Sequence, residues 1–378
     1  MSQLRLVDDG ILWINSDPAH KHVSVFFPSV VQWSEKEFIC LYQRGDGLYA
    51  VNNHIAVLRS RDGGVTWNEE GAVHDPSLDD RRYSYHATFT SRLRDGTLVL
   101  CPFRADRSDP QQPFFTDTGG LIANEPVLFT SRDKGQSWSG PTVMSLPKGL
   151  NATQAHSIIE LDRNRWFAAF DQWPAYDDPG PYRPVMLGFY SNDRGQTWQD
   201  PVVMADGSAD GKGFWHGRPL RLHDGRFFSL FWSADMTDPE RGPVNLPIHY
   251  AHADPTGRHW ERPAPTSIPG QTNCTTQLPD GRLAAIYTGR ECDQPGFMVV
   301  LAEDDGRNWD LKNQVRVWDA SGWATIGLNS PDRYPRSHDT IAFGAPALIT
   351  TLNGELFASW WCTYASLTHI RWARIAVE

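Results

Sequence analysis

The sequence contains few cysteines, no excess of positive charge and no long apolar run. Its 378 residues include five cysteines, an odd number, and no two of them stand in a CxxC spacing. A disulfide framework and a cysteine-rich zinc site are therefore not expected. The formal net charge is −10, from 45 acidic and 35 basic residues, which argues against a nucleic-acid-binding protein.

Apolar stretches are short throughout the chain. None reaches the roughly 18 residues that a membrane-spanning helix needs, so no membrane association is expected. Residues 1–15 contain acidic side chains where a signal peptide has an apolar stretch. We therefore expect a cytoplasmic protein. Because no spacing of metal ligands is visible, neither a metal nor a cofactor is expected.

The chain does contain the residues that build a large core. Hydrophobic residues make up 40% of the sequence and charged residues 21%, which excludes a disordered chain. The 31 glycines and 27 prolines favour many turns over long helices. Since all-β proteins of this length can form one unit, residues 1–378 are expected to form a single domain.

An eight-residue element recurs along the chain and ends each time in tryptophan. It reads SRDGGVTW at residues 60–67, SRDKGQSW at 131–138 and SNDRGQTW at 191–198, with weaker copies at 253–260 and 302–309. The mean spacing is about 60 residues. The short aspartate side chain can accept hydrogen bonds from the backbone of its own turn. We therefore predict structural roles for the aspartates, which are Asp62, Asp133 and Asp193 in the full copies.

A second signal alternates with the first and is typical of β-hairpins. Two-residue turns stand between extended, apolar segments, a strong hairpin pattern. Four such turns occur, and two four-residue segments fill the remaining places, which makes six hairpins. Together with the tryptophan element they predict an all-β, six-bladed β-propeller with four strands in each blade. We expect the N-terminal residues, around 4–14, to supply the outer strand of the last blade. The turns lie at residues 34–37, 95–96, 162–165, 224–225, 280–281 and 353–354.

The S-x-D-x-G-x-[T/S]-W element resembles the Asp-box, or BNR repeat, of sialidases (neuraminidases). The resemblance implies a sialidase-type propeller and an exo-acting glycoside hydrolase for a terminal sugar, with acidic sugars among the candidates. Residues 41–67 follow the family pattern around a Y-x-R-G segment. On that match Arg44 binds substrate and Asp46 is the general acid or base, while Arg290 corresponds to a carboxylate-binding arginine.

Three positions depart from the sialidase pattern. Phe26 stands where the family's F-R-I-P segment has its arginine, and Ala345 stands where the family has its nucleophilic tyrosine. His216 occupies the place of the glutamate that activates this tyrosine. The family's tyrosine-linked mechanism is therefore not expected in this chain.

The longer loops of the predicted blades all fall at one edge of the sheets. Because antiparallel strands alternate in direction, the tight turns share one edge and the long loops share the other. Function concentrates on such loops. These loops are residues 44–53, 104–125, 171–183, 233–245, 289–296 and 318–341.

Charged and aromatic residues beside these loops are the candidate site residues. Arginine forks bind carboxylates and aromatic faces cover sugar C–H surfaces, so the mixture indicates a small carbohydrate as the partner. The catalytic candidates are Asp46, His86, Asp171 and His216. The substrate-binding candidates are Arg44, Arg104, Trp173, Arg218, Arg290 and Glu291.

Three functions stay open at this point. A glycoside hydrolase needs two carboxylates, for which Asp46 with Asp171 or Glu291 is the best pair, and this is the function we favour. A lyase acting on a uronate would use a histidine or tyrosine base with an arginine, and it would draw on His86, His216, Tyr85 and Arg218. A non-catalytic glycan-binding propeller would use the same aromatic and arginine residues.

Overall fold

The computed structural model describes residues 3–178, 182, 184–238, 242–321, 341–364 and 366–378. The predicted loops at 171–183, 233–245 and 318–341 lie partly outside the described residues. The described part consists of β-strands and turns with two short 3-10 turns, Pro76–Leu78 and Ser208–Asp210, and it contains no α-helix. Accordingly, no described helix is long and apolar enough to span a membrane.

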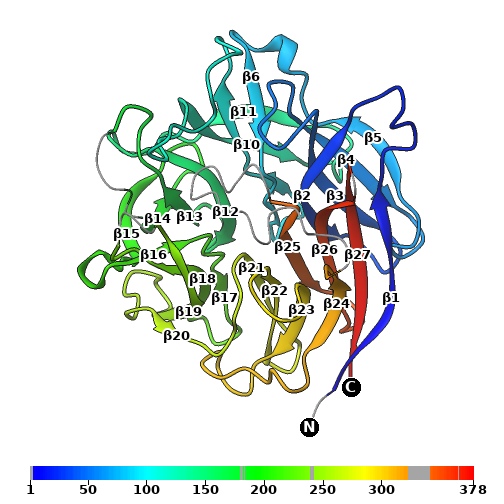
Figure 1. Cartoon of the computed structure of the whole chain (residues 1–378), viewed down its shortest axis with the longest axis vertical. Helices are drawn as coiled ribbons and strands as arrows, with labels where there is room; N and C mark the ends of the chain where they lie inside the picture. The colour runs from blue at the N-terminus through cyan, green and yellow to red at the C-terminus, as the bar shows by residue number, and fades with distance from the viewer. Residues whose placement is uncertain (1–2, 179–181, 183, 239–241, 322–340, 365) are drawn as a thin grey trace. The chain divides into compact units, whose positions relative to one another are not determined.

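The strands form six antiparallel sheets, whose colours follow one another along the chain in Figure 1. In the first, third and fifth sheets four strands lie side by side in chain order, which is the arrangement of a propeller blade. The second and fourth sheets contain strands that are divided into shorter segments, and in the sixth the N-terminal strand follows the last strand of the chain. The predicted fold class, an all-β propeller with six blades, is confirmed. The chain divides into two compact units with three sheets each, Asn15–Val203 and the pair Met1–Ile14 with Met204–Glu378.

The unit Asn15–Val203 contains the first three sheets, except for the last two residues of β15. The first comprises β2 (Ser24–Gln32), β3 (Phe38–Gly45), β4 (His54–Ser60) and β5 (Asn68–Ala72). The second comprises β6 (Tyr83–His86), β7 (Thr90–Arg92), β8 (Leu98–Leu100), β9 (Phe103–Asp106), β10 (Asn124–Ser131) and β11 (Ser139–Val143). The third comprises β12 (Ala152–Glu160), β13 (Trp166–Gln172), β14 (Met186–Ser191) and β15 (Gln199–Ala205).

The other unit contains the remaining three sheets. The fourth comprises β16 (Lys212–Trp215), β17 (Leu220–Arg221), β18 (Phe227–Asp235), β19 (Val244–Ala253) and β20 (Ala264–Pro265). The fifth comprises β21 (Asn273–Gln277), β22 (Leu283–Gly289), β23 (Gly296–Leu301) and β24 (Val315–Asp319). The sixth comprises β25 (Phe343–Thr350), β26 (Leu356–Tyr364), β27 (Leu367–Val377) and β1 (Leu4–Trp13).

The N-terminal strand completes the last blade, as predicted. β1 pairs antiparallel with β27, from Leu4 opposite Val377 to Trp13 opposite Ile370. Leu4 and Leu12 are each 4% exposed, whereas most of the strand between them faces solvent. β1 therefore covers the edge of β27, which would otherwise be open to pairing with another chain.

The six tight turns connect the first and second strands of the blades, as predicted. Glycine follows Asp or Asn in four of them because the backbone there has a positive φ, which glycine adopts without strain. These are Gly96 at 84°, Gly225 at 90°, Gly281 at 92° and Gly354 at 84°.

The aspartates of the tryptophan element hold their own turns, as predicted. Asp62 accepts hydrogen bonds from the Thr66 hydroxyl at 2.5 Å and the Thr66 backbone at 3.0 Å. Asp133 and Asp193 accept from the backbone of the residue four positions on, at 2.9 Å in each case. Hydrogen bonding to Thr66 lowers the pKa of Asp62 to about 2. These carboxylates therefore stabilise turns.

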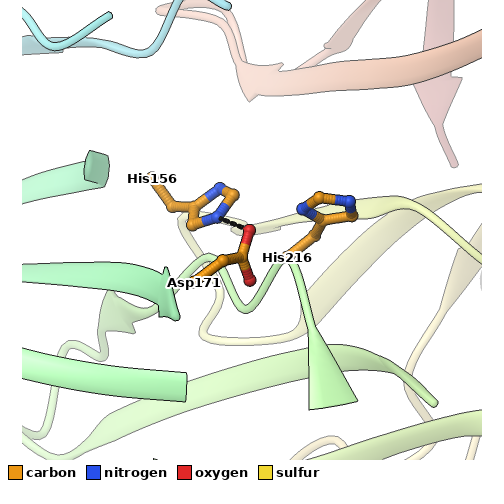
Figure 2. A group of neighbouring side chains, drawn as sticks. All are labelled: His156, Asp171 and His216. Atoms are coloured by element: carbon orange, nitrogen blue, oxygen red, sulfur yellow. Dashed lines mark hydrogen bonds and ion pairs between the residues drawn. The ribbon is translucent and has the colours of Figure 1, made fainter. Parts of the chain in front are cut away.

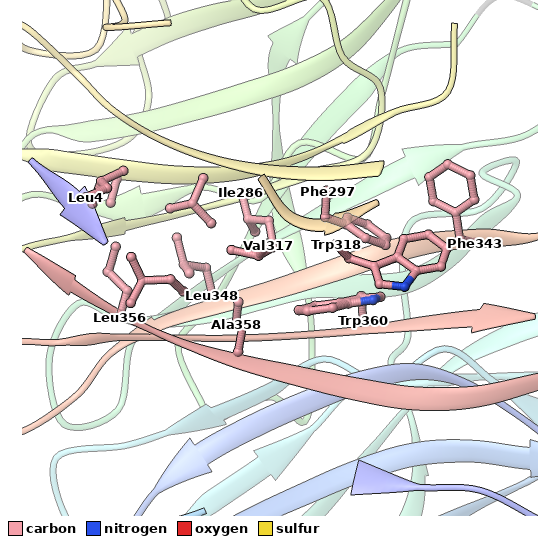
Figure 3. Close-up of a cluster of buried hydrophobic side chains, with 14 of the residues drawn as sticks. Leu4, Ile286, Phe297, Val317, Trp318, Phe343, Leu348, Leu356, Ala358 and Trp360 are labelled. Carbon is pink, nitrogen blue, oxygen red and sulfur yellow. The ribbon is translucent and has the colours of Figure 1, made fainter. Parts of the chain in front are cut away.

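Aliphatic and aromatic side chains pack together between the fifth and sixth sheets, as Figure 3 shows. The ring of Phe297 on β23 lies 5.4 Å from Phe343 on β25 and 5.3 Å from Trp360 on β26. Trp318 on β24 lies 5.2 Å from Phe343. β22, in the middle sheet of this unit, is buried along its whole length. Covered on both faces, the strand reads as an apolar run without polar alternation.

Candidate functional site

The first strand of four blades bends at a non-glycine residue with positive φ, a conformation that costs energy and is frequent at functional sites. At Phe27 and Ala345 the bend accompanies a shift in strand register, as in a β-bulge. Near Ala87 and His216 the first strand is divided into two segments. The φ angles are 50° at Phe27, 58° at Ala87, 54° at His216 and 44° at Ala345.

Five residues of the fourth and fifth blades form a connected group, which we call the Glu291 cluster. The indole of Trp232 on β18 lies 5.5 Å from Trp215 and 5.8 Å from the His216 ring. Trp232 Nε1 donates a hydrogen bond to Asn245 Oδ1, and Asn245 Nδ2 donates to Glu291 Oε1, both at 2.6 Å. Glu291 is exposed and Trp232 is half-buried. The cluster thus presents an oriented carboxylate beside aromatic rings.

Both predicted substrate-binding arginines of this unit are attached to β25. Arg290 donates from Nε to the Phe343 carbonyl at 3.1 Å, from Nη2 to the same oxygen at 2.5 Å, and from Nη1 to Gln271 Oε1. Arg218 donates from Nη1 to the Pro346 carbonyl at 2.7 Å. Burial lowers the pKa of Arg290 to about 10, so this side chain stays protonated at neutral pH.

In the unit Asn15–Val203, two candidate residues pair on neighbouring strands. His156 Nε2 on β12 lies 2.6 Å from Asp171 Oδ2 on β13, and both side chains are 1% exposed (Figure 2). The hydrogen bond holds the carboxylate and the imidazole in fixed orientations toward each other.

His86 lies in a closed, largely aromatic environment. Its ring nitrogens lie 2.7 Å from Ser84 Oγ and 3.4 Å from Asn53 Nδ2. The ring is 5.2 Å from Phe103 and 4.9 Å from Phe114, and the residue is 1% exposed. Burial lowers the pKa of His86 to about 3. This packing indicates that the His86 ring contributes to the stability of the fold, while its catalytic role stays a prediction.

His86 should make the stability of the chain depend on pH. Its pKa of about 3 in the folded chain lies below the ordinary value of 6.5, so the unfolded chain binds the extra proton as the pH falls through 6.5. The contribution to the free energy of unfolding should be complete above 6.5 and decline by up to about 1.4 kcal/mol per pH unit below it.

Urea unfolding of the wild type, His86→Gln and His20→Gln at about pH 7.5 and about pH 5 measures this effect. The wild type and His20→Gln, which changes an exposed ring, should lose more stability on acidification than His86→Gln. An equal loss in all three proteins would contradict the assignment.

Arg44 and Asp46 follow one another at the end of β3 but have different surroundings. The Arg44 guanidinium forms an ion pair with Glu69 on β5, the outer strand of the same blade. Asp46 is exposed, and its backbone N–H donates to Asn52 Oδ1 at 3.1 Å. Asp46 is therefore accessible to a ligand, whereas Arg44 is held by an acid of its own sheet.

Arg104 is part of a network in the second blade. Its Nε and Nη2 atoms lie 3.0 and 2.9 Å from Glu125 Oε2, and its guanidinium lies 4.0 Å from the centre of the Tyr83 ring. Arg104 Nη1 is 4.0 Å from Asp79, which accepts a hydrogen bond from the Tyr85 hydroxyl at 2.8 Å. The predicted ligand-binding arginine thus already has acidic partners.

Trp173, the remaining predicted residue, belongs to a group of stacked rings. It lies 5.4 Å from Tyr182 with the two rings nearly parallel, and 6.0 Å from Phe115. Phe115 in turn lies 5.2 Å from Phe114. The prediction named Trp173 alone, because the two phenylalanines stand in a loop far away in the sequence and show no pattern of their own.

Comparison with known proteins shows the fold. No family model matches the chain, and neither does any curated protein. A protein of unknown function from Dyadobacter fermentans is similar over 100% of both chains, at 16% identity and a TM-score of 0.74. An alpha-L-arabinanase from Penicillium chrysogenum, solved with arabinobiose, is similar over 93% of both chains, at 15% identity and a TM-score of 0.64.

A sialidase also has this fold, again at low sequence identity. The NanB sialidase from Streptococcus pneumoniae is similar over 97% of this chain and 71% of its own, at 12% identity and a TM-score of 0.59. The chain thus shares its fold with proteins that include an arabinanase and a sialidase.

Proposed function

We propose that the chain is a glycan-processing enzyme, specifically a glycoside hydrolase that acts on a terminal sugar. The observation that carries the proposal is the Glu291 cluster, in which Asn245 holds one carboxylate oxygen of Glu291 beside the indole of Trp232. Aromatic faces bind sugar C–H surfaces, and an oriented carboxylate is the reactive group of most glycosidases. The shared fold with an arabinanase and a sialidase supports this class.

Glu291 is proposed as one of the two catalytic carboxylates. Its Oε1 accepts from Asn245, and its Oε2 has no hydrogen-bond partner among the described residues, so one oxygen is held and the other is open. The open oxygen can transfer a proton or attack the anomeric carbon. The catalytic roles of Asp46, which is exposed, and of Asp171, which is enclosed with His156, stay predictions from the sequence.

Arg290 is proposed to position the sugar by its charge. Each terminal nitrogen of its guanidinium donates one hydrogen bond to the protein, which leaves one N–H on each for a ligand. Arg290 makes no ion pair with an acid in the part of the chain that the structure describes. The positive charge is thus fixed in place and available to a polar or acidic substrate.

A uronate lyase is the second candidate, favoured by the strained backbone of His216. This histidine has a φ of 54° and stands two positions before Arg218. A histidine base beside an arginine that neutralises the uronate carboxylate is the requirement for β-elimination.

A panel of neutral arabino-oligosaccharides and acidic sialyl- and uronate-containing oligosaccharides tests the proposal. Products are followed by reducing-end assay, ultraviolet absorbance and mass. New saturated reducing ends are expected from at least one substrate. An unsaturated uronate product would replace the hydrolase by the lyase, and binding without any product would indicate a glycan-binding protein.

A further inference from the structure

Arg107, directly after β9, is a buried arginine whose guanidinium has no hydrogen-bond or ion-pair partner among the described residues. The residue is 5% exposed, and its Nε and Nη1 atoms are enclosed without a hydrogen bond. Within the described residues its guanidinium makes neither a hydrogen bond nor an ion pair. The backbone is nevertheless anchored, since the Arg107 N–H donates to the Arg82 carbonyl at 2.9 Å. Burial of a guanidinium without a partner costs free energy, and a bound anion would offset this cost.

Charged groups of both signs act on Arg107. Burial lowers the pKa of Arg107, and the charge of Arg82 lowers it further, while Asp109 and Tyr176 act in the opposite direction. The charge of Arg107 also contributes to the low pKa of His86, so the neighbouring imidazole stays neutral and adds no charge. Because the Arg107 side chain is buried and has no hydrogen-bonded acid among the described residues, its charge attracts an oxyanion more strongly than it would in water.

A row of aromatic rings begins next to Arg107. Its Cζ atom lies 5.9 Å from the centre of the Phe114 ring. Tyr49 stacks on Phe114 with ring centres 4.5 Å apart, Phe115 lies 5.2 Å from Phe114, and Trp173 lies 6.0 Å from Phe115. We call these four rings the aromatic row. Phe114 and Trp173 are buried, whereas Tyr49 and Phe115 are half-buried. The two half-buried rings are suited to the C–H faces of a sugar, and the adjacent guanidinium to its carboxylate.

We propose that Arg107 binds the carboxylate of an acidic sugar whose ring lies against the aromatic row. The inference rests on the proposed function in that the ligand is a sugar, and it specifies the acidic class. A free inorganic or organic oxyanion would satisfy the same guanidinium, so the experiment must separate the two sources of the anion.

Direct binding measurements test this site without requiring turnover. Sodium glucuronate, glucose, acetate and sulfate are titrated into the wild type and into Arg107→Met, with thermal unfolding and calorimetry as readouts. Glucuronate should raise the Tm of the wild type in a concentration-dependent manner, and glucose should not. Arg107→Met should weaken glucuronate binding at least about tenfold, the loss of one charge-assisted hydrogen bond or more.

The stability of Arg107→Met provides a second readout. Because methionine replaces an unpaired buried charge with an apolar chain of similar length, Arg107→Met should be at least as stable as the wild type without anions. Arg132→Met, which changes an exposed arginine, is the matched control and should bind glucuronate normally.

Three results would overturn the proposal. The first is that Arg107→Met binds glucuronate as the wild type does, and the second is that glucose binds as tightly as glucuronate. The third is that acetate and sulfate bind as tightly as glucuronate, which would indicate a site for a free anion. Glucuronate binding that depends on Arg107, in a protein that cleaves no glycan, would refute the hydrolase and leave this site standing.

Discussion

Glu291→Gln is expected to reduce kcat/KM on a cleaved glycan by about 10²- to 10⁴-fold. The amide keeps the shape of the side chain but can neither carry a negative charge nor give up a proton. Because Glu291 is exposed, the substitution removes no buried contact. The fold should therefore be unchanged, and the Tm should change no more than for an ordinary surface substitution. Steady-state kinetics with thermal unfolding of the same samples measures both quantities.

Glu303→Gln is the matched control for this variant. Glu303 is an exposed glutamate in the same unit, in the tryptophan element that follows β23, where its backbone N–H donates to the Asn308 carbonyl. Its activity should equal that of the wild type. Full activity of Glu291→Gln would remove Glu291 from the chemistry, and equal losses in both variants would point to a general effect of charge.

Leu4→Ala is expected to lower the free energy of unfolding by about 2 to 4 kcal/mol. Leu4 is 4% exposed and packs in the cluster that also contains Leu356 and Ile375, so its truncation leaves a cavity under the closing strand. Leu6→Ala on the same strand changes a side chain that is 36% exposed and should cost less than about 0.5 kcal/mol. Urea unfolding of the two variants compares the buried and the exposed side of β1.

Removal of the whole strand should have a larger effect. Without residues 1–13 the edge of β27 is open, and the chain should associate through it during refolding and storage. Size-exclusion chromatography after dilution from urea reports this association. A truncated chain that refolds as a monomer with wild-type stability would show that β1 is dispensable.

The fold was predictable because its signals are local. Asp-Gly at 224–225 and 280–281 specifies a tight turn by backbone chemistry alone, and the turn fixes which strands pair. The aspartate of each tryptophan element bonds within its own turn, as Asp133 does with Ser137 four residues later. Such features repeat with the blades, so a single sequence displays them several times.

The site was predictable only in part because its contacts are long-range. Glu291 was named from its place after a strand, but its partner Asn245 stands 46 residues earlier and carries no signal. His86 was named from the same reasoning, yet neighbouring rings enclose it. Arg107 was missed because the segment FRADRSD reads as a polar loop, and only the fold shows that this one arginine is buried.

The incorporation of oxygen from water tests the central claim most directly. A cleaved oligosaccharide is incubated with the enzyme in water enriched in heavy oxygen, and the products are weighed by mass spectrometry. A glycoside hydrolase adds one water across the bond, so the released terminal sugar should carry one heavy oxygen at its anomeric carbon. An unlabelled product that contains a double bond would contradict hydrolysis and identify an elimination.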